Sequence, residues 1–285
     1  MFSCDQIQTL RDAHSQNFGV LYYDEGQIQK MDDICKTILA KCPPNKLPAL
    51  AISIFARQKY TQKYRDRFGD VELPYSGLFR KVVYTKNLVR AVKSMEISSP
   101  YTIDSFKIPQ HTLVLYLDLN PKSQIEVLND LHHSMVSNLV HEHKEKEDFS
   151  FTDEFTTMLL SSKRPLVKHF DIDIDTKNNL VLRDFYVACP YLLDNVFFIV
   201  ETNGGFHLVM KEGTNMQSFF MVLKRDKQLE KPYFHEDSVD CNGKPIPKKA
   251  MIEILSDVRI PIPGTVQGNF PVRFVSLDEF KELIQ

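Results

Sequence analysis

The sequence predicts a mixed fold of helices and β-strands, of the α/β or α+β class, built as two modules. Apolar residues recur at helical spacing mainly in the first half of the 285-residue chain, whereas patterns typical of strands dominate the second half. Between them, residues 141–148 are highly charged and lack an apolar period. We therefore expect a helical or mixed module at residues 1–148 and a second module at residues 149–285. Because strands and helices interleave, an all-helical or all-β domain is excluded.

The first half contains two expected helices and one expected strand. Apolar residues spaced three and four apart predict a helix over residues 28–39, which the pair Pro43-Pro44 stops. The apolar run at residues 113–117 predicts a buried strand that ends at Asn120-Pro121. Helical spacing returns over residues 125–139 and predicts the second helix.

The second half is dominated by expected strands. Alternating apolar and polar residues predict strands over residues 167–175 and 271–276. Two more, at residues 196–201 and 206–211, flank a short turn that contains glycine and therefore predict a hairpin. Residues 216–229 have the apolar spacing of a helix.

Composition and charge exclude several classes of protein. Lys and Arg number 35 against 37 Asp and Glu, so the net charge of -2 does not indicate a protein that coats nucleic acid indiscriminately. No apolar run is long enough to span a membrane, and the N-terminus lacks the features of a signal peptide. The five cysteines include no CxxC pair, which indicates neither a disulfide framework nor a zinc site. We expect a soluble intracellular protein of the cytoplasm or nucleus, in a host cell if a virus encodes it.

The sharpest motif is the segment FDIDID at residues 170–175. On a strand, Asp171, Asp173 and Asp175 project from one face, while the apolar residues between them pack on the other. Carboxylates about 7 Å apart repel one another unless a cation compensates, and oxygen ligands suit Mg²⁺ or Mn²⁺. A solvated strand face is the alternative. An EF-hand is unlike this segment, because Thr176 and Leu182 stand where that loop needs glycine and glutamate.

A second motif is the turn and strand TNGGFH at residues 202–207. The glycines Gly204 and Gly205 permit positive φ and a tight turn, and a turn without side chains allows backbone N–H groups to approach a phosphate. In the strand that follows, His207 and Lys211 share one face and could bind a triphosphate. A plain hairpin whose polar face carries His and Lys is the alternative.

A third motif is the loop at residues 256–268, in which prolines and glycines exclude a regular element. Asp257 and Arg259 precede the turn Pro263-Gly264-Thr265 and are placed to line a site, although a structural loop would look similar. The chain lacks both GxxxxGK[ST] and GxGxxG, so the two commonest nucleotide-binding loops are excluded.

Taken together, the three motifs resemble, in order and spacing, the signatures of the archaeo-eukaryotic primase superfamily of primase-polymerases. The resemblance covers residues 167–274: Asp171 and Asp173 match its DxD, Gly205-Phe206-His207 matches its small-x-His, and Asp257 matches its third acidic position. Residues 115–121 are also similar to a strand and turn of phage-encoded relatives. The zinc-binding cysteines of many primases are missing from this sequence.

The resemblance implies a primase-polymerase core, with a helical N-terminal module and an RRM-like C-terminal sheet. It implies a nucleotidyltransferase that primes or extends a nucleic-acid strand, with two Mg²⁺ or Mn²⁺ ions held by Asp171, Asp173 and Asp257. Asp173 and Asp175 could instead serve as the DxD pair. His207 would contact the incoming nucleoside triphosphate. The segment Phe55-Ala56-Arg57-Gln58 is similar to a helical segment that presents a basic residue to nucleotide phosphates. The residues expected to bind the nucleotide are His207, Lys211, Gly204, Gly205, Arg57 and Arg259.

A local basic segment predicts contact with a nucleic-acid template or primer. Residues 57–93 carry ten basic and three acidic residues, a net charge of +7, and the rest of the chain carries -9. Tyr60 and Tyr64 interleave with the positive charges, as in proteins that stack bases beside phosphate contacts. A solvated basic helix face is the alternative. The expected contact residues are Lys59, Lys63, Arg67, Arg80 and Lys81.

Two other classes remain open at this stage. The chain could be a nucleic-acid-binding scaffold of the same fold that has lost catalysis. Its expected partners would then be proteins of a replication or repair assembly. It could also be another DxD metal enzyme, a nuclease or a glycosyltransferase, although neither explains the hairpin histidine and the Pro-Gly-Thr loop as well.

Overall fold

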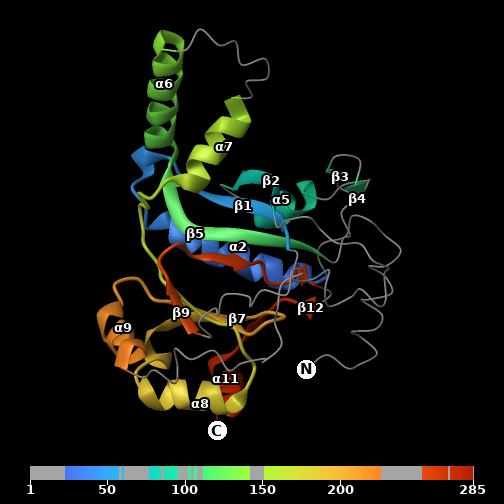
Figure 1. The fold of residues 1–285 in the computed structure, drawn as a ribbon, viewed down its shortest axis with the longest axis vertical. Coiled ribbons are helices and arrows are strands. Elements are labelled where there is room, and N and C mark those ends of the chain that lie inside the picture. The colour runs from blue at the N-terminus through green and yellow to red at the C-terminus, as the bar shows by residue number, and fades with distance from the viewer. Residues whose placement is uncertain are drawn as a thin grey trace, which may run out of the picture. The chain divides into compact units, whose positions relative to one another are not determined.

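The computed structural model describes residues 23–57, 60, 77–84, 87–95, 102–103, 106–107, 112–141, 151–225, 252–268 and 270–284. The chain divides into two compact units (Figure 1). Unit 1 comprises residues 1–168 and 259–273, and unit 2 comprises residues 169–258 and 274–285. The expected boundary at residue 148 therefore differs from the division found, since residues 149–168 and 259–273 lie with the N-terminal part.

Unit 1 is built on a four-stranded antiparallel sheet in the order β10-β5-β1-β2. Helices lie on both faces: α2 contacts β1 and β5, and α7 contacts β1 and β2. The strands are β1 (Pro48–Ala56), β2 (Gly77–Tyr84), β5 (Leu113–Ser123) and β10 (Arg259–Pro261). The helices are α2 (Glu25–Ala40), η1 (Pro44–Lys46), α5 (Leu88–Ser94), α6 (Gln124–His141) and α7 (Phe151–Ser161). Two small ribbons, β3 (Thr102–Ile103) with β4 (Phe106–Lys107) and β11 (Val266–Gln267) with β12 (Phe270–Pro271), complete the unit.

Helix α2 confirms the helix expected over residues 28–39. Asp24 caps its N-terminus by accepting a hydrogen bond from the Gln27 N–H at 3.1 Å. Its apolar residues at spacings of three and four are buried, and the helix ends at Ala40, before the two prolines. Helix α6 likewise confirms the helix expected over residues 125–139.

Strand β1 corrects the expectation that Phe55-Ala56-Arg57-Gln58 is helical. Phe55 and Ala56 are the last residues of β1, Arg57 follows the strand, and Gln58 lies outside the described residues. The segment PALAISIFA is buried on both faces because α2 and α7 pack on opposite sides of the sheet (Figure 1). A strand buried on both faces has no polar alternation, so it cannot be told from a buried helix by period alone.

Strand β5 is longer than expected, because Asn120 and Pro121 do not end it. The register pairs Ala51 with Asp118 but Ala49 with Lys122, so β5 carries extra residues opposite Leu50. Such a bulge accommodates a proline, which has no N–H to donate to the neighbouring strand.

Unit 2 contains a five-stranded sheet in the order β13-β7-β8-β6-β9, with α8, α9 and α11 contributing to its apolar core. The hairpin expected around residues 202–205 is confirmed by β7 and β8, and β6 is antiparallel to both β8 and β9. The strands are β6 (Asp171–Ile174), β7 (Val196–Glu201), β8 (Phe206–Met210), β9 (Ile252–Leu255) and β13 (Arg273–Val275). The helices are α8 (Asn179–Ala188), η3 (Leu193–Asn195), α9 (Met216–Arg225) and α11 (Leu277–Ile284).

The protein is thus a mixed helix-and-sheet fold with antiparallel sheets, which agrees with the expected class at that level. The strand expected over residues 167–175 is shorter than expected, since β6 spans only Asp171–Ile174. Among the described helices, none has both the length and the apolar character needed to cross a membrane.

Candidate functional site

Strand β6, an inner strand of the unit 2 sheet, separates a carboxylate face from an apolar core. Ile172 and Ile174 are fully buried in the core formed with the helices of unit 2. Asp171 and Asp173 alternate with them and lie on the other face, as the sequence predicts. The alternation of DIDI therefore fixes the orientation of the strand and places both aspartates on the face opposite the apolar core.

His207 on β8 joins the two aspartates into one cluster. The register places His207 directly opposite Asp173, and its Nδ1 lies 2.7 Å from the Asp171 Oδ2 and 3.8 Å from the Asp173 Oδ1. The Asp171 side chain is fully buried. A buried carboxylate needs a compensating charge or hydrogen bond, and His207 supplies it.

The cluster alters the protonation of His207. Burial lowers the pKa of this imidazole, but the charge and hydrogen bond of Asp171, with the charges of Asp173 and Asp175, outweigh burial and raise the pKa above its usual value. Nδ1 is engaged by Asp171, and Nε2 makes no hydrogen bond to any described residue. A protonated His207 can therefore donate a second hydrogen bond through Nε2, as a phosphate oxygen would require.

Glu253 on β9 belongs to the same face, and the sequence motifs missed it. The register of β9 against β6 places Glu253 directly opposite Asp173, on the side away from His207. Directly opposed like charges destabilise a sheet unless a cation lies between them. The alternation IEIL at residues 252–255 is a strand signal that could have identified Glu253, but nothing local shows that β9 pairs with β6.

Asp257, the expected third acidic residue, lies just beyond the end of β9. It is exposed and follows β9, four residues beyond Glu253. The pairing therefore brings Glu253, and not Asp257, beside Asp173. Asp175 comes one residue after β6, and its Oδ1 would lie 3.6 Å from a Cβ added at Gly204.

The two glycines of the hairpin have different surroundings, and neither is among the described glycines with positive φ. A Cβ on Gly205 would lie 1.8 Å from the carbonyl oxygen of Ile174, so glycine is required there by the close approach of β6. The Gly205 N–H donates to the Thr202 Oγ1 at 3.2 Å and is used within the turn. Gly204 is exposed.

Lys211 is not brought to His207, although the strand pattern predicts a shared face. β8 ends at Met210, and the exposed Lys211 donates from Nζ to the carbonyl oxygen of Asp194 at 2.7 Å. The strand ends one residue too early for the alternation to position Lys211.

Unit 1 contains a separate cluster of guanidinium and aromatic groups. The Arg57 guanidinium lies over the Tyr116 ring at 5.9 Å from its centroid, and that of Arg259 lies over the Phe55 ring at 5.5 Å. The two rings contact each other edge to face, with centroids 5.7 Å apart. Arg57 and Arg259, which are far apart in sequence, therefore meet at one aromatic pair, where cation–π attraction orients both.

The Pro263-Gly264-Thr265 turn has a structural role within unit 1. Gly264 has a φ of 90°, and its carbonyl oxygen accepts hydrogen bonds from the N–H groups of Tyr23 and Asp24. A Cβ at Gly264 would lie 2.3 Å from the Asp24 carbonyl oxygen. The turn thus holds the start of α2 against the loop that follows Arg259.

The residues expected to bind nucleic acid are largely outside the described part of the chain. Lys59, Lys63 and Arg67 lie outside it. Arg80 and Lys81 lie on β2, opposite Ile54 and Ser53 of β1, and their predicted contacts remain predictions.

Within the described residues, no group of three or more His, Cys, Asp or Glu side chains converges in a way that could hold a metal ion. No protein-family model, curated protein or solved structure matches the chain. The chemistry of the site must therefore be argued from its own residues.

Proposed function

We propose that the protein is a metal-dependent nucleotidyltransferase that primes or extends a nucleic-acid strand. One observation carries the proposal: Asp171, Asp173, His207 and Glu253 come from three neighbouring strands and lie on one face of the unit 2 sheet. Carboxylates combined with a cationic donor are what transfer of a nucleotidyl group from a triphosphate requires.

The residues have separable roles in this proposal. Asp171 is a positioning residue, because its hydrogen bond fixes the ring of His207 and favours the charged imidazole. His207 binds a phosphate oxygen of the nucleotide through Nε2 and stabilises the negative charge that develops on the leaving pyrophosphate. Asp173 and Glu253 would hold a divalent cation, and the rigid sheet fixes the positions of both residues.

The carboxylates of the site have the ligand chemistry of a hard divalent cation, although their side chains do not converge on one point in this structure. Asp173 and Glu253 offer carboxylate oxygens from adjacent strands, with Asp171 next along β6, and such oxygens are the ligands that Mg²⁺ and Mn²⁺ prefer. When bound, such ions neutralise triphosphate charge and activate the attacking 3′-hydroxyl. Glu253 is partly exposed, so we expect its side chain to change rotamer on metal binding.

The guanidinium and aromatic cluster of unit 1 has a matching role in the proposal. Arg57 and Arg259 are oriented by Tyr116 and Phe55, and a guanidinium held flat can bind phosphate oxygens in pairs. We propose that this cluster is a phosphate-binding site of unit 1. With these roles, the two units correspond to the modules of a primase-polymerase core, and the unit 2 sheet to its RRM-like module.

The experiment is primer extension by the purified full chain, with a primed template, Mg²⁺ or Mn²⁺ and nucleoside triphosphates. Asp173→Asn and Glu253→Gln should each reduce extension by at least about 100-fold, the scale of removing one electrostatic group from an active site. Asp184→Asn, which alters an exposed carboxylate on α8, is the matched control and should extend normally. Undiminished extension by the Asp173→Asn, Glu253→Gln double variant would refute the assignment.

A second candidate is a binding scaffold that has lost catalysis. The observation that favours it is the 2.7 Å pairing of Asp171 with His207, which leaves one member of the DxD motif engaged within the protein. A scaffold would bind primed template without lengthening the primer in the presence of Mg²⁺ or Mn²⁺. Its affinity for the template would be unchanged in Asp173→Asn.

A further inference from the structure

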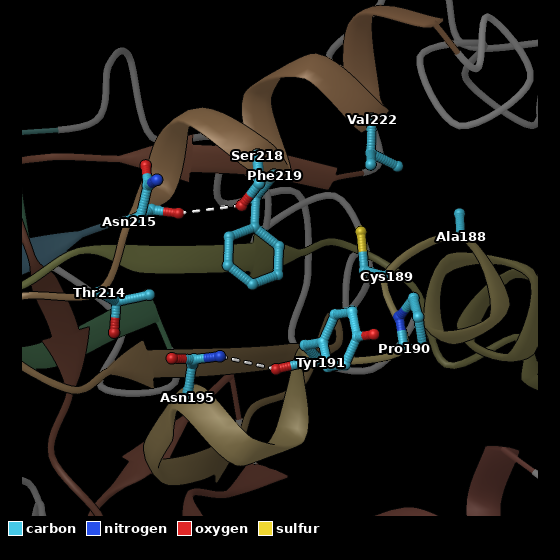
Figure 2. Close-up of a pocket in the computed structure, with 10 residues that line it drawn as sticks. All are labelled: Ala188, Cys189, Pro190, Tyr191, Asn195, Thr214, Asn215, Ser218, Phe219 and Val222. Atoms are coloured by element: carbon cyan, nitrogen blue, oxygen red, sulfur yellow. Dashed lines mark hydrogen bonds between the residues drawn. The ribbon is translucent and has the colours of Figure 1, made fainter.

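A cavity in unit 2 lies on the side of the sheet away from the carboxylate face. It has a volume of about 320 Å³ and opens between the C-terminal end of α8, the loop after it and the first turns of α9 (Figure 2). Cys189 and Phe219 line it and also belong to the core that includes Ile172. Since Ile172 and Asp173 point to opposite faces of β6, the cavity is separate from the candidate catalytic site.

Figure 2 shows that the two ends of the cavity differ in chemistry. The polar end is formed by Asn195, Thr214, Asn215 and Ser218. The rings of Phe219 and Tyr191 face the space in the middle, where they can contact a third ring. The other end is apolar and is formed by Ala188, Cys189, Pro190 and Val222.

The polar end offers hydrogen-bond acceptors to a ligand, beside the remaining amide N–H groups of Asn195 and Asn215. Asn195 donates from Nδ2 to the Tyr191 carbonyl oxygen at 2.8 Å, which leaves its Oδ1, an acceptor, for a ligand. The Thr214 hydroxyl donates its hydrogen to the Lys211 carbonyl oxygen at 2.7 Å, so its oxygen is likewise an acceptor. An O–H or N–H group on a ligand can therefore bind the acceptors of Asn195 and Thr214 at this end.

The lining also excludes charged ligands. None of the ten lining residues is Asp, Glu, Lys, Arg or His, so a phosphate, carboxylate or ammonium group would enter without a counter-charge. Burial raises the pKa of the Cys189 thiol to about 11, which keeps it protonated near neutral pH and makes it a contact rather than a nucleophile.

We propose that this cavity binds one uncharged aromatic ring that carries an O–H or N–H donor, as in a phenol or an indole. Its volume is at the lower end of that of ligand pockets, which suits a single ring system. The same chemistry is offered by a free small molecule and by a Tyr or Trp side chain of a partner protein. The proposal does not depend on the nucleotidyltransferase activity.

The probes are phenol and indole, with toluene and benzoate as comparisons, and the protein is the full chain. The chain has no tryptophan, so indole fluorescence reports on the probe without background. Phenol should bind roughly three- to tenfold more tightly than toluene, the value of one net hydrogen bond, and benzoate should not bind. Thr214→Val should remove the preference for phenol and leave toluene affinity unchanged.

Two phenylalanine variants test the location. Ala188→Phe fills the cavity and should weaken indole binding at least tenfold, whereas Val187→Phe adds the same ring at a neighbouring residue that is 71% exposed and outside the lining, and should leave binding intact. Circular dichroism checks that each variant folds; if Ala188→Phe fails to fold, the Thr214→Val comparison still decides. Equal indole binding by the wild type and Ala188→Phe, absence of binding by every probe, or equal affinity for phenol and toluene would overturn the proposal.

A peptide with a single tryptophan distinguishes the two sources of the ring. If the peptide binds more than tenfold more tightly than indole and Ala188→Phe abolishes this, the ligand is a partner protein. If it binds no more tightly than indole, the ligand is a free aromatic molecule.

Discussion

The buried carboxylate of Asp32 joins three elements of unit 1, and its removal should be costly. Asp32 lies on α2, is 1% exposed, and accepts hydrogen bonds from the Tyr84 hydroxyl and from the Leu88 N–H, each at 2.6 Å. Lys36 forms an ion pair with it at 2.6 Å. Asp32 therefore holds the end of β2 and the start of α5 against α2.

The magnitude follows from what Asp32→Ala leaves behind. The Tyr84 hydroxyl and the Leu88 N–H lose their buried acceptor, at about 1–3 kcal/mol each, so we expect a loss of about 3–5 kcal/mol in the free energy of unfolding. Tyr84→Phe removes one of these hydrogen bonds and should cost about 1–1.5 kcal/mol. Lys36→Met should cost much less, because that ammonium is half exposed.

The assay is urea unfolding of the full chain, followed by circular dichroism, at neutral and acid pH. Burial raises the pKa of Asp32, but the hydrogen bonds from Lys36, Tyr84 and Leu88 outweigh burial and lower it below the usual value. The contribution of Asp32 to the free energy of unfolding should therefore be complete above about pH 4 and be lost as the pH falls further. A loss of less than about 1 kcal/mol in Asp32→Ala, or a loss in Asp32→Asn that does not shrink at acid pH, would refute the reasoning.

Two further predictions concern unit 2. Gly205→Ala should destabilise the protein by about 2–4 kcal/mol, because its Cβ would overlap the Ile174 carbonyl oxygen at 1.8 Å. Gly204→Ala should be nearly neutral, because the nearest neighbour of its Cβ would be at 3.6 Å. Urea unfolding that ranks Gly204→Ala as the more damaging change would contradict this. Because the pKa of His207 is raised in the folded protein, the contribution of His207 to the free energy of unfolding is complete below about pH 6.5. That contribution is lost as the pH rises through the pKa of the folded state. The stability difference between the wild type and His207→Gln, measured in a chelator, should shrink with rising pH, and a difference that grows would count against the Asp171–His207 pair.

The sequence predicts the elements whose periodicity is decided locally. Spacing within one segment predicts the apolar faces of α2 and α6, the hairpin of β7 and β8, and the alternation of Asp171–Ile174. The helical expectation for Phe55 and Ala56 was wrong because the two-sided burial of β1 comes from α2 and α7, which no local pattern reveals. Pro121 was expected to end β5, but a bulge opposite Leu50 accommodates it.

The candidate site was predicted in part. The alternation of β6 and the hairpin are local signals that identify Asp171, Asp173 and His207 individually, and the pairing of β6 with β8 brings them together. Glu253 was missed because its place beside Asp173 depends on the pairing of two strands about 80 residues apart in sequence, a separation that local patterns do not bridge. The meeting of Arg57 and Arg259 at Phe55 and Tyr116 is long-range in the same way, although both arginines were singled out individually.

The most direct test of the central claim is a crystal structure of the full chain with Mn²⁺ and a non-hydrolysable nucleoside triphosphate. The account predicts anomalous density for manganese in contact with the carboxylates of Asp173 and Glu253, and a triphosphate oxygen within hydrogen-bonding distance of the His207 Nε2. Manganese bound elsewhere, at Asp257 for example, with Asp173 and Glu253 in contact with solvent alone, would contradict it.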